Sequence, residues 1–385
     1  MNFRISFRFL SIVFLGLNTL FVFANPDAYL GIADYYVFLI GFFLMCVMSK
    51  MRIKKDSNTI IIFFIMGYNL VAIIIALFYG VFSTGYILSY FMYLLLALFM
   101  YSMEYNGLEL KRLVDWYILS GAFISLVLLI QRFDYYGGGN VRHSIKFMSN
   151  TPIDPNFLAA FLVFPCVLAF GKTMRKFSVI RLILFAIIFV GIVYTSSRGA
   201  FLSLVIGVLF VLFGVFHDNN KAKSIIKICI IGLCAGIVFF QFMPTNSVSR
   251  LIDFASYNDN SNAKRFYDWS LGWAAFKNSP ILGYGFQGEM SIIRKVLGVS
   301  FISHNTYIAF LLQLGILGVI FPIYGVGKII LNVKKNYTLL GALLSSLFAS
   351  IFISGQVALF FWLPIIYTMV LAKYEFDNNI VGEWI

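Results

Sequence analysis

The sequence predicts an all-α polytopic membrane protein with about twelve transmembrane helices and no separate soluble domain. Of its 385 residues, 61% are hydrophobic, 12% are charged and 44 are phenylalanine, a balance that soluble domains of this length do not show. Apolar stretches of the length that a spanning helix needs recur along the chain, and short polar segments separate them. We therefore expect residues 1–385 to form a single integral membrane domain.

These apolar stretches define the expected spans. The first follows Arg4 and Arg8, as the apolar part of a signal peptide would, but a second span comes almost at once, which favours a retained helix. The last two are short and turn at Ser354 and Gly355, whereas one long tilted helix there would move the tail to the other side. The approximate bounds are 9–24, 28–49, 59–80, 84–103, 113–131, 156–171, 179–195, 199–216, 225–243, 305–327, 338–355 and 357–372.

The distribution of Lys and Arg predicts the orientation of these spans. The basic segments fall between spans that share one side, and the positive-inside rule makes that side cytoplasmic, with both termini. The net charge of +13 has the same explanation, so nucleic acid is not an expected partner. The clearest basic segments are SKMRIKKD, EYNGLELKR, KTMRK, HDNNKAKS and LNVKKN.

Residues 243–304 are the longest polar interruption, and we expect them to form a large loop on the outer face. Ser261 or Asn262 can cap a helix within this loop, and Pro280 ends it. The pattern predicts an amphipathic helix lying in the membrane interface, although a lid helix with a solvated charged face fits it equally well. Four aromatic residues recur in it at helical spacing: Phe266, Trp269, Trp273 and Phe276.

A GxGxxG match follows this helix at Gly283, Gly285 and Gly288. The dinucleotide fingerprint requires a strand before it and a helix after it in a βαβ unit, and a loop at the membrane surface supplies neither. Nucleotide binding is therefore rejected.

Arg198 stands alone in a long uncharged stretch, within TSSRGAFLSL. The expected topology places it in a tight outer turn, with small neighbours such as Ser197 and Gly199 and the N-terminus of the next helix beside it. Free amides at a helix N-terminus and a fixed guanidinium group together favour an anion such as a diphosphate. The alternative is an arginine that snorkels to the membrane surface.

His304 lies directly before the span that starts near residue 305, in the sequence SHNTYIAFLLQLGILG. A helix N-terminus disfavours the imidazolium form, so the ring would be able to accept a proton at neutral pH. The alternative is a structural histidine. His143 and His217 do not cluster with it in sequence, and no metal-ligand spacing is present, so neither a metal nor a cofactor is expected.

Four stretches occur together in the order IDPNFLAAFL (153–162), TSSRGAFLSL (195–204), KRFYDWSLGWAAFKNSPILGYGF (264–286) and SHNTYIAFLLQLGILG (303–318). In this order they resemble the O-antigen polymerase and O-antigen ligase superfamily, the Wzy-type polymerases and their lipid A-core ligase relatives. The resemblance covers residues 153–318, and the first 130 residues match only as a set of spans.

The resemblance implies a GT-C-like membrane glycosyltransferase that uses an undecaprenyl-diphosphate-linked sugar as donor. In such enzymes two arginines hold the diphosphate and a histidine activates the acceptor hydroxyl, which correspond here to Arg198, Arg265 and His304. Arg142 is the candidate for a further arginine that precedes the family's PN pair. Three residues are candidates for supporting roles: Asn156, Asn305 and Asp268.

The resemblance further implies the reaction and its setting. A polymerase would join lipid-linked repeat units at the outer side of a bacterial plasma membrane, inverting the anomeric centre without a metal. A ligase, the alternative, would transfer the glycan to lipid A core or another acceptor. A lipid-sugar flippase is the rival from another class, although transporters tend to show repeated halves. Expected partners are the lipid-linked donor and acceptor, membrane lipids and, as candidates, a chain-length regulator and a flippase.

Overall fold

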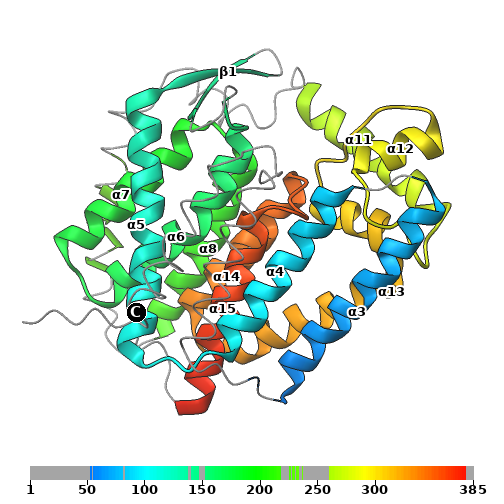
Figure 1. Ribbon diagram of the computed structural model, residues 1–385. Helices are drawn as coiled ribbons and strands as arrows, with labels where there is room; N and C mark the ends of the chain where they lie inside the picture. Colours follow the sequence, from blue (N-terminus) through cyan, green and yellow to red (C-terminus); the bar gives the residue numbers. More distant parts are fainter. Residues whose placement is uncertain are drawn as a thin grey trace, which may run out of the picture.

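A computed structural model of the chain describes residues 53, 55–80, 83–137, 140–146, 152–217 and 260–378, with a few residues between 225 and 236. These residues form a bundle of helices that run alternately up and down (Figure 1). Seven of the described helices are long and apolar enough to cross a membrane. They are α3 (Ser57–Phe78), α4 (Thr84–Ser102), α5 (Gly107–Gln131), α6 (Pro155–Arg175), α8 (Arg198–His217), α13 (Thr306–Val333) and α15 (Leu359–Asn378).

Two shorter apolar helices complete the described bundle, α7 (Val179–Tyr194) and α14 (Tyr337–Ala349). Every predicted span that falls on described residues coincides with one of these nine helices, the seven long ones and the two shorter ones, with bounds that differ by a few residues. The predicted spans 9–24 and 28–49 lie outside the described residues, as does more than half of 225–243.

The last pair of helices is a tight antiparallel hairpin. The helix α14 continues into a short 3-10 helix, η3 (Ser350–Phe352), and α15 begins after a turn. At the opposite end, the Asn336 side-chain amide at the start of α14 donates a 2.6 Å hydrogen bond to Glu375 Oε1, near the end of α15. The prediction of two spans that turn near Ser354 is therefore correct, and the alternative of one tilted helix is wrong.

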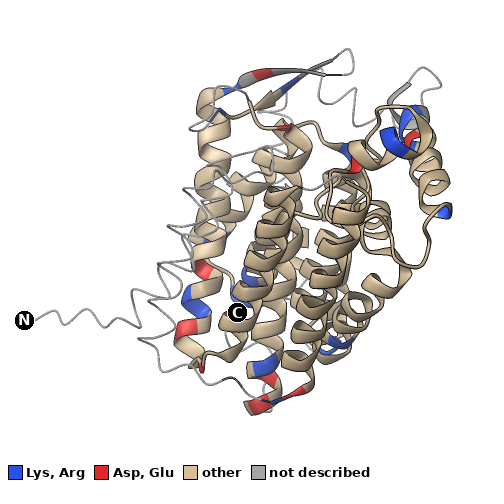
Figure 2. Ribbon diagram, turned by 45° about the vertical axis from the view of Figure 1, so that its right-hand side comes forward, with Lys and Arg blue, Asp and Glu red and all other residues tan. Residues whose placement is uncertain are grey.

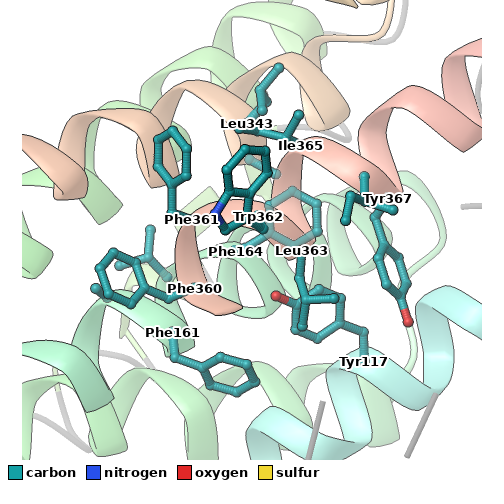
Figure 3. Packing of buried hydrophobic residues seen from close by; sticks show 14 of the residues in the cluster. Tyr117, Phe161, Phe164, Leu343, Phe360, Phe361, Trp362, Leu363, Ile365 and Tyr367 are labelled. Carbon is teal, nitrogen blue, oxygen red and sulfur yellow. The ribbon is translucent and has the colours of Figure 1, made fainter. Parts of the chain in front are cut away.

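The helix α6 forms the centre of the bundle, because 94% of the residues in its most apolar stretch are buried. Aromatic rings of α5, α6 and α15 pack around it (Figure 3). The ring centroids of Tyr117 and Tyr367 lie 4.8 Å apart, and those of Tyr117 and Phe164 lie 5.3 Å apart. Offset aromatic packing of this kind stabilises a core beyond the area that it buries. It holds the helix that carries the PN pair in a fixed position.

Charged residues gather at the ends of the described bundle (Figure 2). One end, here called the basic end, carries the cationic residues of the short loops, such as Lys111, Lys176 and Lys334. The other, here called the hairpin end, carries a two-stranded antiparallel sheet of β1 (Phe133–Gly137) and β2 (Asn140–Ser144). The expectation of an all-α fold missed this hairpin, although the glycine-rich sequence between the strands is of the kind that joins antiparallel strands.

Two further helices, α11 (Asn260–Lys277) and α12 (Glu289–Leu297), also lie at the hairpin end (Figure 1). The predicted helix in the 243–304 loop is α11, whereas α12 was not predicted. The four aromatic residues of α11 do not share one environment. Phe276 is buried against Ile292 of α12 and Ile308 of α13, and Trp269 packs beside it, while Phe266 is 66% exposed and Trp273 is 45% exposed. One side of α11 therefore packs on protein and the other remains open.

The helix α13 is broken at Gly315, whose φ of 63° and ψ of −174° are not helical. Backbone groups freed at membrane depth must find other partners. The loop after α11 supplies them: the amides of Tyr284 and Gly285 donate to the carbonyl groups of Leu312 and Gln313, both at 2.8 Å. The Tyr68 hydroxyl donates to the next carbonyl, that of Leu314, also at 2.8 Å. Two glycines of the rejected nucleotide motif, Gly283 and Gly285, thus belong to a backbone contact with α13, whereas Gly288 caps α12.

Gly283→Ala is expected to destabilise the protein. Gly283 has a φ of +68°, and a Cβ atom there would lie 2.7 Å from the carbonyl oxygen of Gln313. A left-handed conformation alone costs a residue with a side chain about 1–2 kcal/mol, and the overlap adds to that cost. Thermal unfolding in detergent should show a clearly lower midpoint. The matched control is Gly327→Ala on α13, where a Cβ meets nothing within 4 Å; an equal effect of both changes would contradict the account.

Candidate functional site

The turn between α7 and α8 places Arg198 at the hairpin end. The chain reverses over three residues, and Ser196 takes a left-handed backbone conformation with a φ of 52°. The first residue of α8 is Arg198, only 7% of which is exposed. A snorkelling arginine would extend into water or lipid headgroups. The burial of Arg198 instead places its guanidinium group inside the protein, at a helix N-terminus.

Asn156 connects this turn to the β-hairpin. Its Oδ1 atom accepts a hydrogen bond from Ser197 Oγ at 3.0 Å and another from Arg142 Nη1 at 3.1 Å. Arg142 is buried on β2, so the hairpin carries this arginine inward to the start of α6. The amide of Asn156 therefore joins three elements, β2, α6 and the turn before Arg198.

Asp154 connects this group to His304. It caps α6, and its Oδ1 atom accepts the backbone N–H of Asn156 at 2.8 Å and the side-chain amide of the same residue at 3.0 Å. It is also close enough to His304 to raise the pKa of the imidazole. Asp-Pro-Asn before an apolar run is typical of a helix start, but the sequence analysis singled out neither this cap nor its proximity to His304.

His304 lies at the head of α13 in a strained backbone conformation. Its φ of 51° is left-handed, which is uncommon for a residue with a side chain. Asn305 follows as the helix cap, and its Oδ1 atom accepts the backbone N–H groups of Tyr307 at 2.9 Å and Ile308 at 3.2 Å. Asn305 is therefore the cap of α13, and the imidazole belongs to the residue just before it.

The surroundings of His304 favour its neutral form. The side chain remains partly exposed, yet the protein packed around it removes part of its hydration, which lowers the imidazole pKa below its ordinary value. The cations of Arg265 and Lys264 act in the same direction, whereas Asp154 and Asp268 oppose them. A neutral imidazole can accept a proton.

Arg265, Asp268 and His304 form a second group of charges. The first two lie on α11, one turn apart, and both interact electrostatically with the imidazole. Asp268 is only 1% exposed, and burial raises its carboxyl pKa, while His304, Lys264 and Arg265 act to lower it. The fold thus brings Arg265 and Asp268 of α11 close to His304, which is distant from them in sequence.

Glu289 is a buried carboxylate that the sequence did not single out. It is the first residue of α12, and its Oε1 atom accepts the backbone N–H of Ser303 at 2.6 Å. Its Oε2 atom accepts the Ser354 hydroxyl at 2.9 Å. Burial raises the carboxyl pKa, and the hydrogen bonds from Ser303 and Ser354 oppose that shift. No motif in the sequence marks this residue, because its partners come from two distant loops.

The helices α6, α8 and α13 all begin at this end of the bundle. Arg198 is the first residue of α8, Arg142 bonds to Asn156 at the start of α6, and His304 directly precedes the cap of α13. Each helix N-terminus presents amide groups and a partial positive charge. Guanidinium groups beside helix N-termini form a favourable environment for a phosphate or diphosphate. Among the described residues, no group of three or more His, Cys, Asp or Glu side chains could hold a metal ion.

An apolar cavity of about 430 Å³ lies between α3, α4, α13 and α15. It is lined by residues such as Leu94, Phe310, Val326 and Ile366, and at one end it reaches Tyr307, three residues after His304. None of the candidate site residues lines it. The cavity could hold hydrocarbon but offers little to a charged group.

Comparison with known proteins gives one family. A search of curated proteins finds no match. The family model described as O-antigen ligase matches residues 183–323, a segment that holds Arg198, Arg265 and His304. This family points to a membrane enzyme of the O-antigen ligase and polymerase type, with lipid-linked glycans as substrates. The match covers less than half of the chain, and it supports the resemblance of this segment to the O-antigen polymerase and ligase superfamily.

Proposed function

We propose that the protein is a glycosyltransferase that polymerises undecaprenyl-diphosphate-linked oligosaccharide repeat units at the outer side of the bacterial plasma membrane. The observation that carries the proposal is the convergence of Arg142, Arg198, Arg265 and His304 on one end of the bundle, among helix N-termini. The positive-inside rule supports assigning this end to the outer face and both termini to the cytoplasm.

The guanidinium groups and helix N-termini would bind the diphosphate of the donor. When the bond between the anomeric carbon and the diphosphate oxygen breaks, the electron pair stays on the diphosphate, and its charge grows. Buried cations already in position stabilise that charge without reorganising. Arg198 and Arg265 are the proposed diphosphate ligands. Arg142 supports the turn before Arg198, because Asn156 accepts hydrogen bonds from both Arg142 and Ser197.

His304 would act as the general base. As the acceptor hydroxyl oxygen attacks the anomeric carbon, its proton passes to the neutral imidazole. Attack from the side opposite the diphosphate, in a single displacement, inverts the anomeric centre. A diphosphate is already a good leaving group, so the proposal needs no metal. Asp268 and Asp154 would stabilise the imidazolium ion that forms, because both carboxylates favour the charged ring.

The apolar cavity beside α13 supports a lipid-linked substrate. It lies among helices that are long enough to cross a membrane, and it reaches Tyr307, close in sequence to His304. The lining of this cavity is almost entirely apolar, so hydrocarbon can lie there without burying a polar group. The isoprenoid chain of a donor or acceptor could therefore lie there while its diphosphate reaches the arginines.

A ligase is the second candidate, because the matching family model is described as O-antigen ligase. The two activities differ only in the acceptor. Deletion of the gene in a bacterium that carries lipid A core should separate them. For a polymerase we expect core that bears single repeat units, whereas loss of a ligase would leave bare core. Analysis of the lipopolysaccharide by gel electrophoresis distinguishes the two results, and the wild-type gene supplied in trans is the control.

Arg198→Ala and Arg265→Ala should each lower kcat/KM by about 100-fold, because each removes a charge that stabilises the departing diphosphate. The assay uses purified protein with a synthetic undecaprenyl-diphosphate oligosaccharide, with and without a chelator. Arg294→Ala, which removes an exposed arginine of α12 at the same end, is the matched control and should stay near wild type. Full activity of either site variant would overturn the diphosphate assignment, and product that requires added metal would overturn the metal-free reaction.

The pH dependence should report His304. Activity requires the neutral imidazole, so kcat/KM should fall as the pH drops through a pKa below the ordinary histidine value. Asp268 raises that pKa, so Asp268→Asn should move the acidic midpoint to still lower pH. Asp134→Asn is the control, because Asp134 lies 3.4 Å from His143 and is not among the charges that act on His304. A midpoint that stays in place in Asp268→Asn, or remains in His304→Ala, would contradict the assignment.

A further inference from the structure

The loop that carries His304 is tied to the turn before α15 at two points. The first is Glu289, which accepts the backbone N–H of Ser303 with one carboxylate oxygen and the Ser354 hydroxyl with the other. The second is Thr306, whose hydroxyl donates to the carbonyl of Ile353 at 2.6 Å and accepts the N–H of Gly355 at 2.8 Å. These contacts hold the chain on both sides of His304, at Ser303 and at Thr306.

The backbone of His304 needs such restraint. Its left-handed φ is disfavoured for a residue with a side chain and persists only where the surroundings determine it. On its N-terminal side the restraint is Ser303, which Glu289 holds from α12. Ser303 Oγ in turn accepts the N–H of Asn305 at 3.2 Å. One buried carboxylate therefore fixes the residues on which the direction of the imidazole depends.

We propose that Glu289 is a positioning residue of the reaction: through Ser303 and Ser354 it holds His304 where the imidazole can reach the acceptor hydroxyl. This inference rests on the proposed function, in which His304 is the base. Glu289 is 3% exposed, and its hydrogen bonds with Ser303 and Ser354 do not involve the imidazole, so it acts on the reaction through the backbone of the loop.

The proposal depends on the reach of the side chain rather than on its charge, and two substitutions separate these properties. Glu289→Gln keeps the length, an oxygen for the Ser303 amide and a second polar group for Ser354, but it removes the charge. Glu289→Asp keeps the charge but is one methylene shorter, so it cannot span both partners. A misplacement of about 1 Å can cost on the order of 100-fold in rate.

The experiment measures kcat and the donor KM of the full-length protein with the synthetic undecaprenyl-diphosphate oligosaccharide. We expect Glu289→Asp to lower kcat roughly 10- to 100-fold with little change in KM. Glu289→Gln should restore kcat to within about threefold of wild type. Ser291→Ala, on the exposed side of α12, is the matched control. The reverse order, with Asp fast and Gln slow, would overturn the proposal, and the Gln result decides it even when Glu289→Asp does not fold.

A double-mutant cycle separates positioning from a general structural role. If Glu289 acts through His304, Glu289→Asp should cost little in a His304→Ala background, whereas damage to the fold would cost the same in both backgrounds. Equal costs would therefore refute the proposal.

Hydrogen exchange of the segment around Ser303 gives a readout that does not need activity. The amide of Ser303 should exchange faster in Glu289→Asp than in the wild type or in Glu289→Gln, because it loses its acceptor. A wild-type protein that transfers no sugar but shows this pattern would refute the proposed function and leave the tie in place. An active wild type with unchanged exchange in Glu289→Asp would refute the tie itself.

Discussion

The rest of the site depends on the positive charge that gathers where several helix N-termini meet at the hairpin end. Each of α6, α8 and α13 begins there with backbone amides that have no partner within the helix. At α6 and α13 the caps Asp154 and Asn305 satisfy some of these amides. At α8 the first residue is a buried arginine. Positive helix ends and cations repel one another, so this arrangement is stable only with carboxylates or a bound anion close by.

The carboxylates at this end have distinct tasks. Asp154 and Asp268 both act on the imidazole, and they approach it from different helices, α6 and α11. Glu289 makes its contacts with the backbone and a hydroxyl group, and so shapes the loop that carries the imidazole. The carboxylates that act on the His304 imidazole are thus different from the carboxylate that restrains the backbone around it.

The sequence predicted the described apolar helices well, but it predicted only part of the site. Apolar stretches predict spans well because lipid forces the backbone to pair within each segment, and the tight turn at Arg198 followed from them. The motif order groups Arg198, Arg265 and His304 as candidates for one site, and this grouping stays a prediction. The hairpin that buries Arg142, the helix α12 and the contacts of Glu289 were missed. These features depend on pairings between loops that are far apart in the chain, which no local periodicity records.

The break at Gly315 has a mechanical consequence. The first turns of α13, which follow His304, are joined by backbone hydrogen bonds to the loop after α11, and α11 carries Arg265. Arg198 and Arg142 belong to the other side of the site, on α8 and β2. The loop after α11 also bonds to α13 beyond the break, because the amides of Ile316 and Leu317 donate to the carbonyl groups of Pro280 and Ile281 at 2.9 and 3.2 Å. A displacement of this loop would therefore be transmitted to α13 on both sides of Gly315, and through its first turns to His304.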